Sequence, residues 1–136
     1  HLVIFEGWCV GARHQKNGEL KKPLNSIEKK HDADLIWRRT VNNSLKNQYK
    51  KLFNKIDRLV YLKAPNFKDI FKWRLLQEQK MKLTSKSKKT MSKSQIRDFI
   101  MYYERITKNM MKNFSRISDL TVFLDKSHRS KRMKFY

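Results

Sequence analysis

A single carboxylate, Glu6, directly follows an apolar run at residues 2–5 and precedes a glycine. Such an uninterrupted run, with two β-branched residues, is typical of a strand that is buried on both faces of a parallel sheet. In open α/β sheets, ligands bind just beyond the carboxyl ends of the strands. We therefore expect Glu6 to lie where an acid could hold a metal ion or accept a proton. Because this buried strand would begin at the first residues, we also expect the chain to be the later part of a longer protein.

A second group of polar side chains shares one face of a predicted helix. Arg74, Gln77 and Glu78 are spaced by three and four residues, which places them side by side. Arg74 and Glu78 could form a surface ion pair of little energetic value, or the guanidinium could bind phosphate oxygens. The serine- and lysine-rich stretch at about 83–91 is predicted to be a mobile loop. The lysines in and near it could attract phosphate but are more typical of a solvated loop; they are Lys80, Lys82, Lys86, Lys88 and Lys89.

The spacing of apolar residues predicts an alternation of strands and helices. Ser92 and Gln95 form a capping-box signature at the start of the last helix. Strands are predicted at about 2–5, 58–63 and 119–124, and helices at about 33–56, 67–81 and 92–113. Residues 7–22 are predicted to form a polar loop, and a basic tail closes the chain. This order predicts an α/β fold with an incomplete parallel sheet and flanking helices.

Length and composition indicate one globular domain. A chain of 136 residues, of which 39% are hydrophobic, can bury a core. Its single cysteine, Cys9, cannot form an internal disulfide, which fits a reducing compartment. No apolar run approaches the roughly 20 residues that span a bilayer, and no secretory leader is recognisable. These features predict a cytoplasmic protein without a membrane partner.

The formal net charge of +21 allows two interpretations. A strongly basic protein attracts polyanions such as nucleic acid, anionic membranes or phosphorylated ligands. However, the lysines are spread along nearly the whole chain instead of forming one block. We therefore favour a solvated, lysine-biased surface, and a nucleic-acid-binding face remains the alternative.

Several segments in order resemble the D-glycerate 3-kinase family, a group of P-loop kinases related to phosphoribulokinase, uridine kinase and pantothenate kinase. The matching segments are 5–13 (FEGWCVGAR), 23–28 (PLNSIE), 37–39 (WRR), 41–42 (VN), 49–53 (YKKLF), 56–57 (ID), 62–67 (LKAPNF), 73–78 (WRLLQE), 103–107 (YERIT) and 124–125 (LD). The family's phosphate-binding loop, G-x-x-x-x-G-K-[ST], does not occur in this sequence. The resemblance therefore implies that residues 1–136 are the C-terminal part of one P-loop kinase domain, without its Walker A loop and first strands.

The absence of the phosphate-binding loop and the first strand should affect the stability and activity of the isolated chain. In kinases of this type, the first strand lies between the strands that correspond to residues 2–5 and 59–62. Without it, the sheet would contain a slot with unpaired backbone groups. We therefore expect the chain alone to be marginally stable, aggregation-prone or dependent on a partner, and to be inactive. The expected partner is the N-terminal half of the kinase.

The resemblance also implies roles for individual residues. Glu6 corresponds to an acid that serves Mg²⁺ or the acceptor hydroxyl; the alternative is a carboxylate at a helix N-terminus or in a salt bridge. A lid at about 74–105 would bind the nucleotide phosphates through Arg74, Gln77, Glu78 and Arg105. The acceptor pocket would contain Arg13, Asn25, Arg38 and Asn42, because glycerate offers a carboxylate to arginine and hydroxyls to amides. An exposed helix face is the alternative interpretation for Arg38 and Asn42.

These roles describe an ATP- and Mg²⁺-dependent kinase. The full-length protein would phosphorylate D-glycerate to 3-phosphoglycerate. A second hypothesis keeps the fold but assigns another small hydroxylated acceptor or a nucleoside. A third is a degenerate kinase remnant whose basic surface binds nucleic acid or a protein partner.

Overall fold

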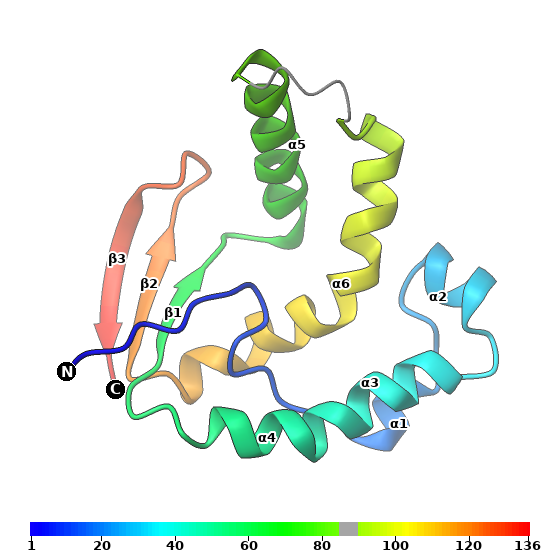
Figure 1. Cartoon of the computed structure of the whole chain (residues 1–136), viewed down its shortest axis with the longest axis horizontal. Helices are drawn as coiled ribbons and strands as arrows, with labels where there is room; N and C mark the ends of the chain where they lie inside the picture. Colours follow the sequence, from blue (N-terminus) through cyan, green and yellow to red (C-terminus); the bar gives the residue numbers. More distant parts are fainter. Residues whose placement is uncertain (85–89) are drawn as a thin grey trace.

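The computed structural model describes residues 1–84 and 90–136, and the expected α/β fold is confirmed. The first half of the chain contains four short helices: α1 (Asn17–Leu20), α2 (Ser26–His31), α3 (Ile36–Lys46) and α4 (Gln48–Phe53). The second half contains β1 (Val60–Lys63), α5 (Phe67–Thr84), α6 (Lys93–Asn113), a 3₁₀ turn η1 (Phe114–Arg116), β2 (Leu120–Leu124) and β3 (Ser130–Phe135). The three strands lie together at one end of the molecule; α5 leads away from them, and α6 begins beside α5 and returns toward the sheet (Figure 1).

The sheet is mixed rather than purely parallel. Its strand order is β1-β2-β3, with β1 parallel to β2 and β3 antiparallel to β2. The predicted strands at 58–63 and 119–124 are confirmed as the parallel pair, but the basic tail is a strand instead of an unpaired end. The carboxylate of Asp125 builds the turn before β3, because its Oδ1 accepts hydrogen bonds from the N–H groups of Ser127 (2.7 Å) and Arg129 (2.9 Å). This turn reverses the chain onto the free edge of β2.

The strand predicted at residues 2–5 does not form. This segment is not part of the sheet, and its side chains are exposed, from 88% for Leu2 to 55% for Phe5. Figure 1 shows the segment passing the sheet without joining it. A strand needs a neighbour that accepts and donates its backbone hydrogen bonds, and no described strand pairs with this one. Consequently, Glu6 follows an extended, exposed segment and not the carboxyl end of a strand.

The helix predicted at 33–56 is also wrong, because two helices occupy this range. Asp32 delays the start of α3: its Oδ1 accepts from the N–H of Trp37 (2.8 Å) and its Oδ2 from the N–H of Arg38 (3.1 Å). At Asn47 the backbone leaves the helical path, with φ −110° and ψ −78°, and α4 begins at the next residue. The predicted loop at 7–22 contains the short helix α1. In contrast, α6 begins as predicted, with both hydrogen bonds of the Ser92 capping box present.

The main core lies between the sheet and the helices α3 and α6. It contains Ala12, Leu45, Tyr61, Met110 and Phe114. The rings of Tyr61 and Phe114 meet edge to face with centroids 5.2 Å apart. Burial raises the pKa of Tyr61 to about 12, because the phenolate would lose its hydration. This core fixes α6 on the sheet and thereby positions the side chains that α6 contributes to the candidate site.

One face of the sheet carries exposed apolar side chains. Val60 and Leu62 of β1 and Met133 and Phe135 of β3 share this face by strand alternation and register. They are between 55% and 75% exposed. We call these four residues the apolar sheet face. Among the described residues, no helix has both the length and the apolar character that crossing a membrane requires.

Candidate functional site

An open cleft lies beyond the carboxyl ends of β1 and β2. Helix α5 follows β1 and provides Trp73, Arg74 and Gln77, the turn after β2 provides His128, and the N-terminal segment provides Trp8. The cleft has a volume of about 620 Å³, which is within the usual range of ligand pockets. We call it the strand-end cleft. Its position is the one that open α/β sheets use for ligands.

Aromatic contacts hold the walls of this cleft together. The indole N–H of Trp73 donates to the carbonyl of Lys126 (2.9 Å), and its ring lies 4.2 Å from that of His128. Trp8 stacks on Tyr103 of α6 with ring centroids 5.2 Å apart. Glu6 is two residues before Trp8, with an exposed side chain. The structure therefore brings Arg74 and Gln77 into one cleft and places Glu6 two residues along the chain from its wall.

Arg74, which lines this cleft, forms an ion pair with Glu78, a buried acid one turn further along α5. The Arg74 Nη1 lies 2.6 Å from Glu78 Oε2, and the N–H of Met91 donates to Glu78 Oε1 (2.6 Å). The N–H of Met91 and the Arg74 guanidinium hold the pKa of Glu78 below its usual range. Glu78 thus ties α5 to the segment before α6 and orients Arg74. A guanidinium has five donors, so Arg74 keeps donors for a further ligand.

A second, smaller cavity lies between α3 and α6 beneath the α1 and α2 segment. It has a volume of about 50 Å³, and we call it the inner cavity. Three of the four predicted acceptor residues line it: Arg13, Arg38 and Asn42. Arg105, which we expected in the lid beside Arg74, lines this cavity and not the strand-end cleft. The fourth predicted acceptor residue, Asn25, is not among its lining residues.

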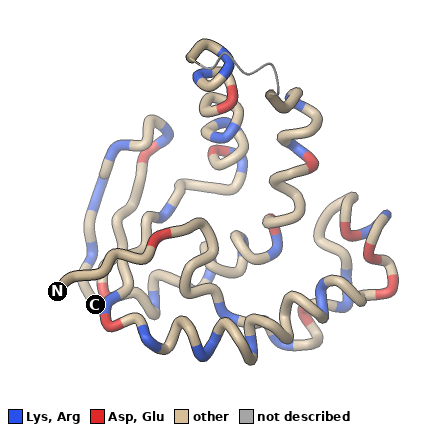
Figure 2. The backbone as a smooth tube through the Cα atoms, in the orientation of Figure 1, with Lys and Arg blue, Asp and Glu red and all other residues tan. Residues whose placement is uncertain are grey.

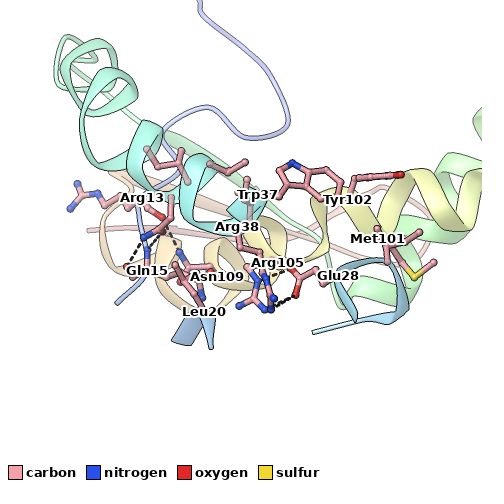
Figure 3. Close-up of a pocket in the computed structure, with 15 residues that line it drawn as sticks. Arg13, Gln15, Leu20, Glu28, Trp37, Arg38, Met101, Tyr102, Arg105 and Asn109 are labelled. Carbon is pink, nitrogen blue, oxygen red and sulfur yellow. Dashed lines mark hydrogen bonds and ion pairs between the residues drawn. The ribbon is translucent and has the colours of Figure 1, made fainter. Parts of the chain in front are cut away.

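Buried charges form the inner side of this cavity (Figure 3). Arg105 holds Glu28 through both carboxylate oxygens, with its Nε 2.7 Å from Oε1 and its Nη2 2.6 Å from Oε2. It also donates to the carbonyls of Glu19 (2.9 Å) and Lys22 (2.8 Å). Arg105 therefore ties the segment that contains α1 and α2 onto α6.

Arg38 makes the second buried pair. Its Nε donates to Asp32 Oδ2 (2.7 Å) and its Nη2 to the carbonyl of Asp32 (2.6 Å). The side chain is 4% exposed, so the interpretation of Arg38 as part of an exposed helix face is wrong. Asn42 is buried as well and exchanges two hydrogen bonds with the backbone of Gln15, at 2.7 and 3.1 Å.

Asn25 has a mainly architectural set of contacts. Its Oδ1 accepts from the N–H of Glu28 (3.0 Å) and caps α2. Its Nδ2 donates to the carbonyl of Met101 and to Glu104 Oε2, both at 2.9 Å. Asn25 therefore docks the start of α2 on α6 beside the inner cavity.

The sequence did not point to Glu28 and Asp32, the two buried acids that pair with Arg105 and Arg38. Glu28 is 77 residues from Arg105, so its partner cannot be found from local spacing. Asp32 is six residues before Arg38, a spacing that belongs to no helical face. The available signal is compositional: few carboxylates in such a basic chain means that each acid has many potential partners.

The pKa values of these two acids predict a loss of stability in acid. Burial opposes their ionisation, but the pKa of Glu28 is lowered by Arg105 and that of Asp32 by the N–H groups of Trp37 and Arg38. Their contribution to stability is therefore complete above the unfolded-state pKa values, about 4, and is lost as the pH falls through the lower folded-state values. We expect the free energy of unfolding in urea to decrease below about pH 4. Asp32→Asn should decrease less steeply, and parallel curves for variant and wild type would contradict this assignment.

The described residues contain no cluster of three side chains that could hold a metal ion by themselves. Mg²⁺ in phosphate-transfer sites is usually bound by one or two carboxylates together with phosphate oxygens and water. The exposed carboxylate of Glu6, which has no ion pair in the described part of the chain, fits this requirement. Of the lysines near the predicted loop, Lys86, Lys88 and Lys89 lie outside the described residues, and Lys80 lines the strand-end cleft.

This α/β fold is similar to that of known structures. The structure matches D-glycerate 3-kinase from Cryptococcus neoformans var. grubii with a TM-score of 0.74 and 22% identity, over 99% of this chain and 50% of that chain. It also matches the YGR205w protein with a TM-score of 0.56 and 20% identity, over 94% of this chain and 45% of that one.

The amino-acid sequence is similar to a kinase as well. It is 34% identical over 102 residues to mug58 of Schizosaccharomyces pombe, which is described as an uncharacterized kinase. This match covers 74% of the chain and 35% of mug58, so the chain spans about a third of that relative's length. No protein-family model matches the chain. Together, the two kinds of similarity confirm the resemblance to D-glycerate 3-kinases.

Proposed function

We propose that residues 1–136 are the C-terminal part of one P-loop kinase domain, and that the whole protein transfers the γ-phosphoryl group of ATP to D-glycerate, giving 3-phosphoglycerate. The observation that carries this proposal is the structural match: nearly all of this chain corresponds to half of a D-glycerate 3-kinase. The kinase relative with 34% identity supports the same reaction class.

In this proposal, the strand-end cleft contributes to phosphoryl transfer. The acceptor hydroxyl oxygen bonds to the γ-phosphorus, the bond from that phosphorus to the β,γ-bridging oxygen breaks, and ADP leaves. Glu6 accepts the hydroxyl proton or holds Mg²⁺. ATP would supply the transferred phosphoryl group, and Mg²⁺ would neutralise the phosphate charge. Arg74, oriented by Glu78, binds phosphate oxygens, and Gln77 offers an amide to the same phosphates.

The acceptor residues of the proposal are Arg13, Arg38 and Asn42, with Asn25 holding the neighbouring helix α2 in place. Arg105 was expected to bind phosphate. Its contacts with Glu28 and two carbonyls engage all three guanidinium nitrogens. We therefore propose that Arg105 positions the wall of the acceptor pocket.

The remaining half of the kinase domain is the proposed partner of the exposed apolar surface. Residues 2–5, the apolar sheet face and the unpaired edge of β1 would be covered by it. Large contiguous apolar patches of this kind mark interaction sites or sites of aggregation. We accordingly propose that the chain alone does not catalyse the reaction.

The exposed apolar surface leads to a prediction about association. The isolated chain should self-associate as its concentration rises, and Leu62→Lys with Phe135→Lys should reduce the association, because both side chains lie on the apolar sheet face. Sedimentation velocity over a range of concentrations measures this. Asn43→Lys with Gln79→Lys adds the same charge at exposed polar positions and should change little. Equal association of both double variants would show that the apolar sheet face is not the cause.

The proposed function is tested by comparing the isolated chain with the complete protein. ATP-dependent phosphoryl transfer is expected only from the complete protein, and the coding sequence before His1 is expected to encode G-x-x-x-x-G-K-[ST] in frame. A stop codon or an unrelated sequence there would favour the kinase remnant.

The charge distribution does not favour the nucleic-acid alternative. Figure 2 shows Lys and Arg on nearly every helix and strand instead of gathered on one element. A groove that tracks a nucleic-acid backbone requires concentrated positive charge. The basic surface therefore fits a solvated, lysine-biased exterior better.

A further inference from the structure

We propose that the inner cavity is the subsite for the carboxylate of a short hydroxycarboxylate acceptor, and that Glu28, Trp37 and Tyr102 make this subsite selective. This inference rests on the proposed function, because it concerns the acceptor of the same reaction. It goes further by stating which end of the acceptor is buried, which atom binds it and what limits its size.

The buried Arg38 side chain has an unused donor. Two nitrogens of Arg38, Nε and Nη2, donate to Asp32, but Nη1 is buried and has no hydrogen-bond partner. Glu28 Oε2 lies 3.5 Å from Arg38 Nη1. A buried donor without a partner is costly. An oxygen that occupies the inner cavity would remove this cost.

Glu28 has little hydrogen-bonding capacity left for Arg38. Its Oε2 already accepts from Arg105 Nη2 and from the N–H of Leu24, both at 2.6 Å, while its Oε1 accepts from Arg105 Nε. The lining contains three arginines, Arg13, Arg38 and Arg105, and one acid, Glu28. Asp32 lies outside the lining but pairs with Arg38. With Asp32 included, these groups carry a net charge of +1, which suits a monoanion.

The volume of the inner cavity limits the size of its ligand. A cavity must offer about 10–15 Å³ to hold one water molecule, and an apolar cavity of about 150 Å³ holds benzene. The inner cavity, at about 50 Å³, accommodates the carboxylate end of a small acid but not a sugar or a base. Asn42 donates only one amide hydrogen to Gln15, so a second donor remains available on the same lining.

Two aromatic side chains stand beside the charged groups. The rings of Trp37 and Tyr102 lie 4.9 Å apart, and both side chains are partly exposed, at 38% and 48%. Figure 3 shows them next to each other beside the cluster of Arg38, Arg105 and Glu28. Together they form an apolar rim beside a bound carboxylate and leave the hydroxyl end of the acceptor outside.

Binding to the complete protein tests this proposal by titration calorimetry with four probes: D-glycerate, acetate, glycerol and inorganic phosphate. D-Glycerate and acetate should bind saturably, whereas glycerol, which lacks the carboxylate, should not. Inorganic phosphate can bind at the phosphate-binding residues of the complete protein, and Arg38→Met should leave this binding unchanged. Arg38→Met should weaken D-glycerate binding at least tenfold. Arg39→Met, on the exposed side of the same helix, should leave it unchanged.

Because Arg38→Met also frees Asp32, a second variant separates binding from folding. Val41→Met fills the cavity without changing any charge and should likewise raise the Kd, with KM for D-glycerate rising more than kcat falls. Unchanged binding in both variants, or no saturable binding of any carboxylate, would overturn the proposal even if the protein is a glycerate kinase. Carboxylate binding that both variants lose, without phosphoryl transfer, would instead support this subsite and contradict the proposed function.

Discussion

Replacing Arg105 by methionine is expected to lower the free energy of unfolding by about 3–5 kcal/mol, the usual cost of removing one partner of a buried ion pair. The loss has a clear physical origin. Glu28, whose side chain is 8% exposed, would keep its charge without its bidentate partner. The carbonyls of Glu19 and Lys22 would also lose the donor that ties them to α6. Urea unfolding at pH 7, followed by circular dichroism, measures the change.

A matched control is available on the same helix. Arg97 is exposed on α6 and forms no ion pair with the described residues, so Arg97→Met should change the free energy of unfolding by less than about 0.5 kcal/mol. If Arg105→Met were no more harmful than Arg97→Met, the buried charge cluster would not be the element that holds the α1 and α2 segment.

Glu6→Gln is expected to reduce the turnover number of the complete protein by about 100-fold or more, the usual contribution of a general base. The amide keeps the size of the side chain but neither accepts a proton nor binds Mg²⁺ with a charge. Because Glu6 is exposed and has no ion pair in the described residues, the variant should unfold at the same urea concentration as the wild type. Steady-state transfer from ATP to D-glycerate measures the effect.

Asp34→Asn provides the control for charge removal, since Asp34 is also exposed and has no partner among the described residues. Its turnover should remain close to that of the wild type. Near-normal turnover of Glu6→Gln would remove Glu6 from the mechanism and would restore the salt-bridge interpretation of this residue.

The elements that could be predicted from the sequence are those whose signals are local. The Ser92 capping box marks the start of α6, and the apolar periodicity of residues 67–81 gives most of α5. Strands depend more on their neighbours. The apolar run at 2–5 has the composition of a strand but lacks a described partner, whereas the basic β3 has a polar sequence and pairs because the Asp125 turn directs it onto β2.

The candidate site likewise contains contacts that local spacing predicts and contacts that it does not predict. Helical spacing correctly places Arg74 and Glu78 side by side, and the ion pair between them is present. Arg38 and Asn42 line one cavity, and their role as acceptor residues stays a prediction. The Glu28–Arg105 pair joins segments that are far apart in the chain, and spacing contains no information about such a contact. The expectation that Arg105 lies in the lid came from the family resemblance, and the contacts of Arg105 with Glu28 place it at the inner cavity instead.

The central claim, that this chain belongs to a kinase acting on D-glycerate, is tested most directly by following the complete protein, ATP, Mg²⁺ and D-glycerate with ³¹P NMR. We expect the γ-phosphate signal of ATP to be replaced by the signals of ADP and 3-phosphoglycerate, and omission of D-glycerate to stop this conversion. A protein that binds ATP but forms no phosphorylated glycerate would contradict the claim.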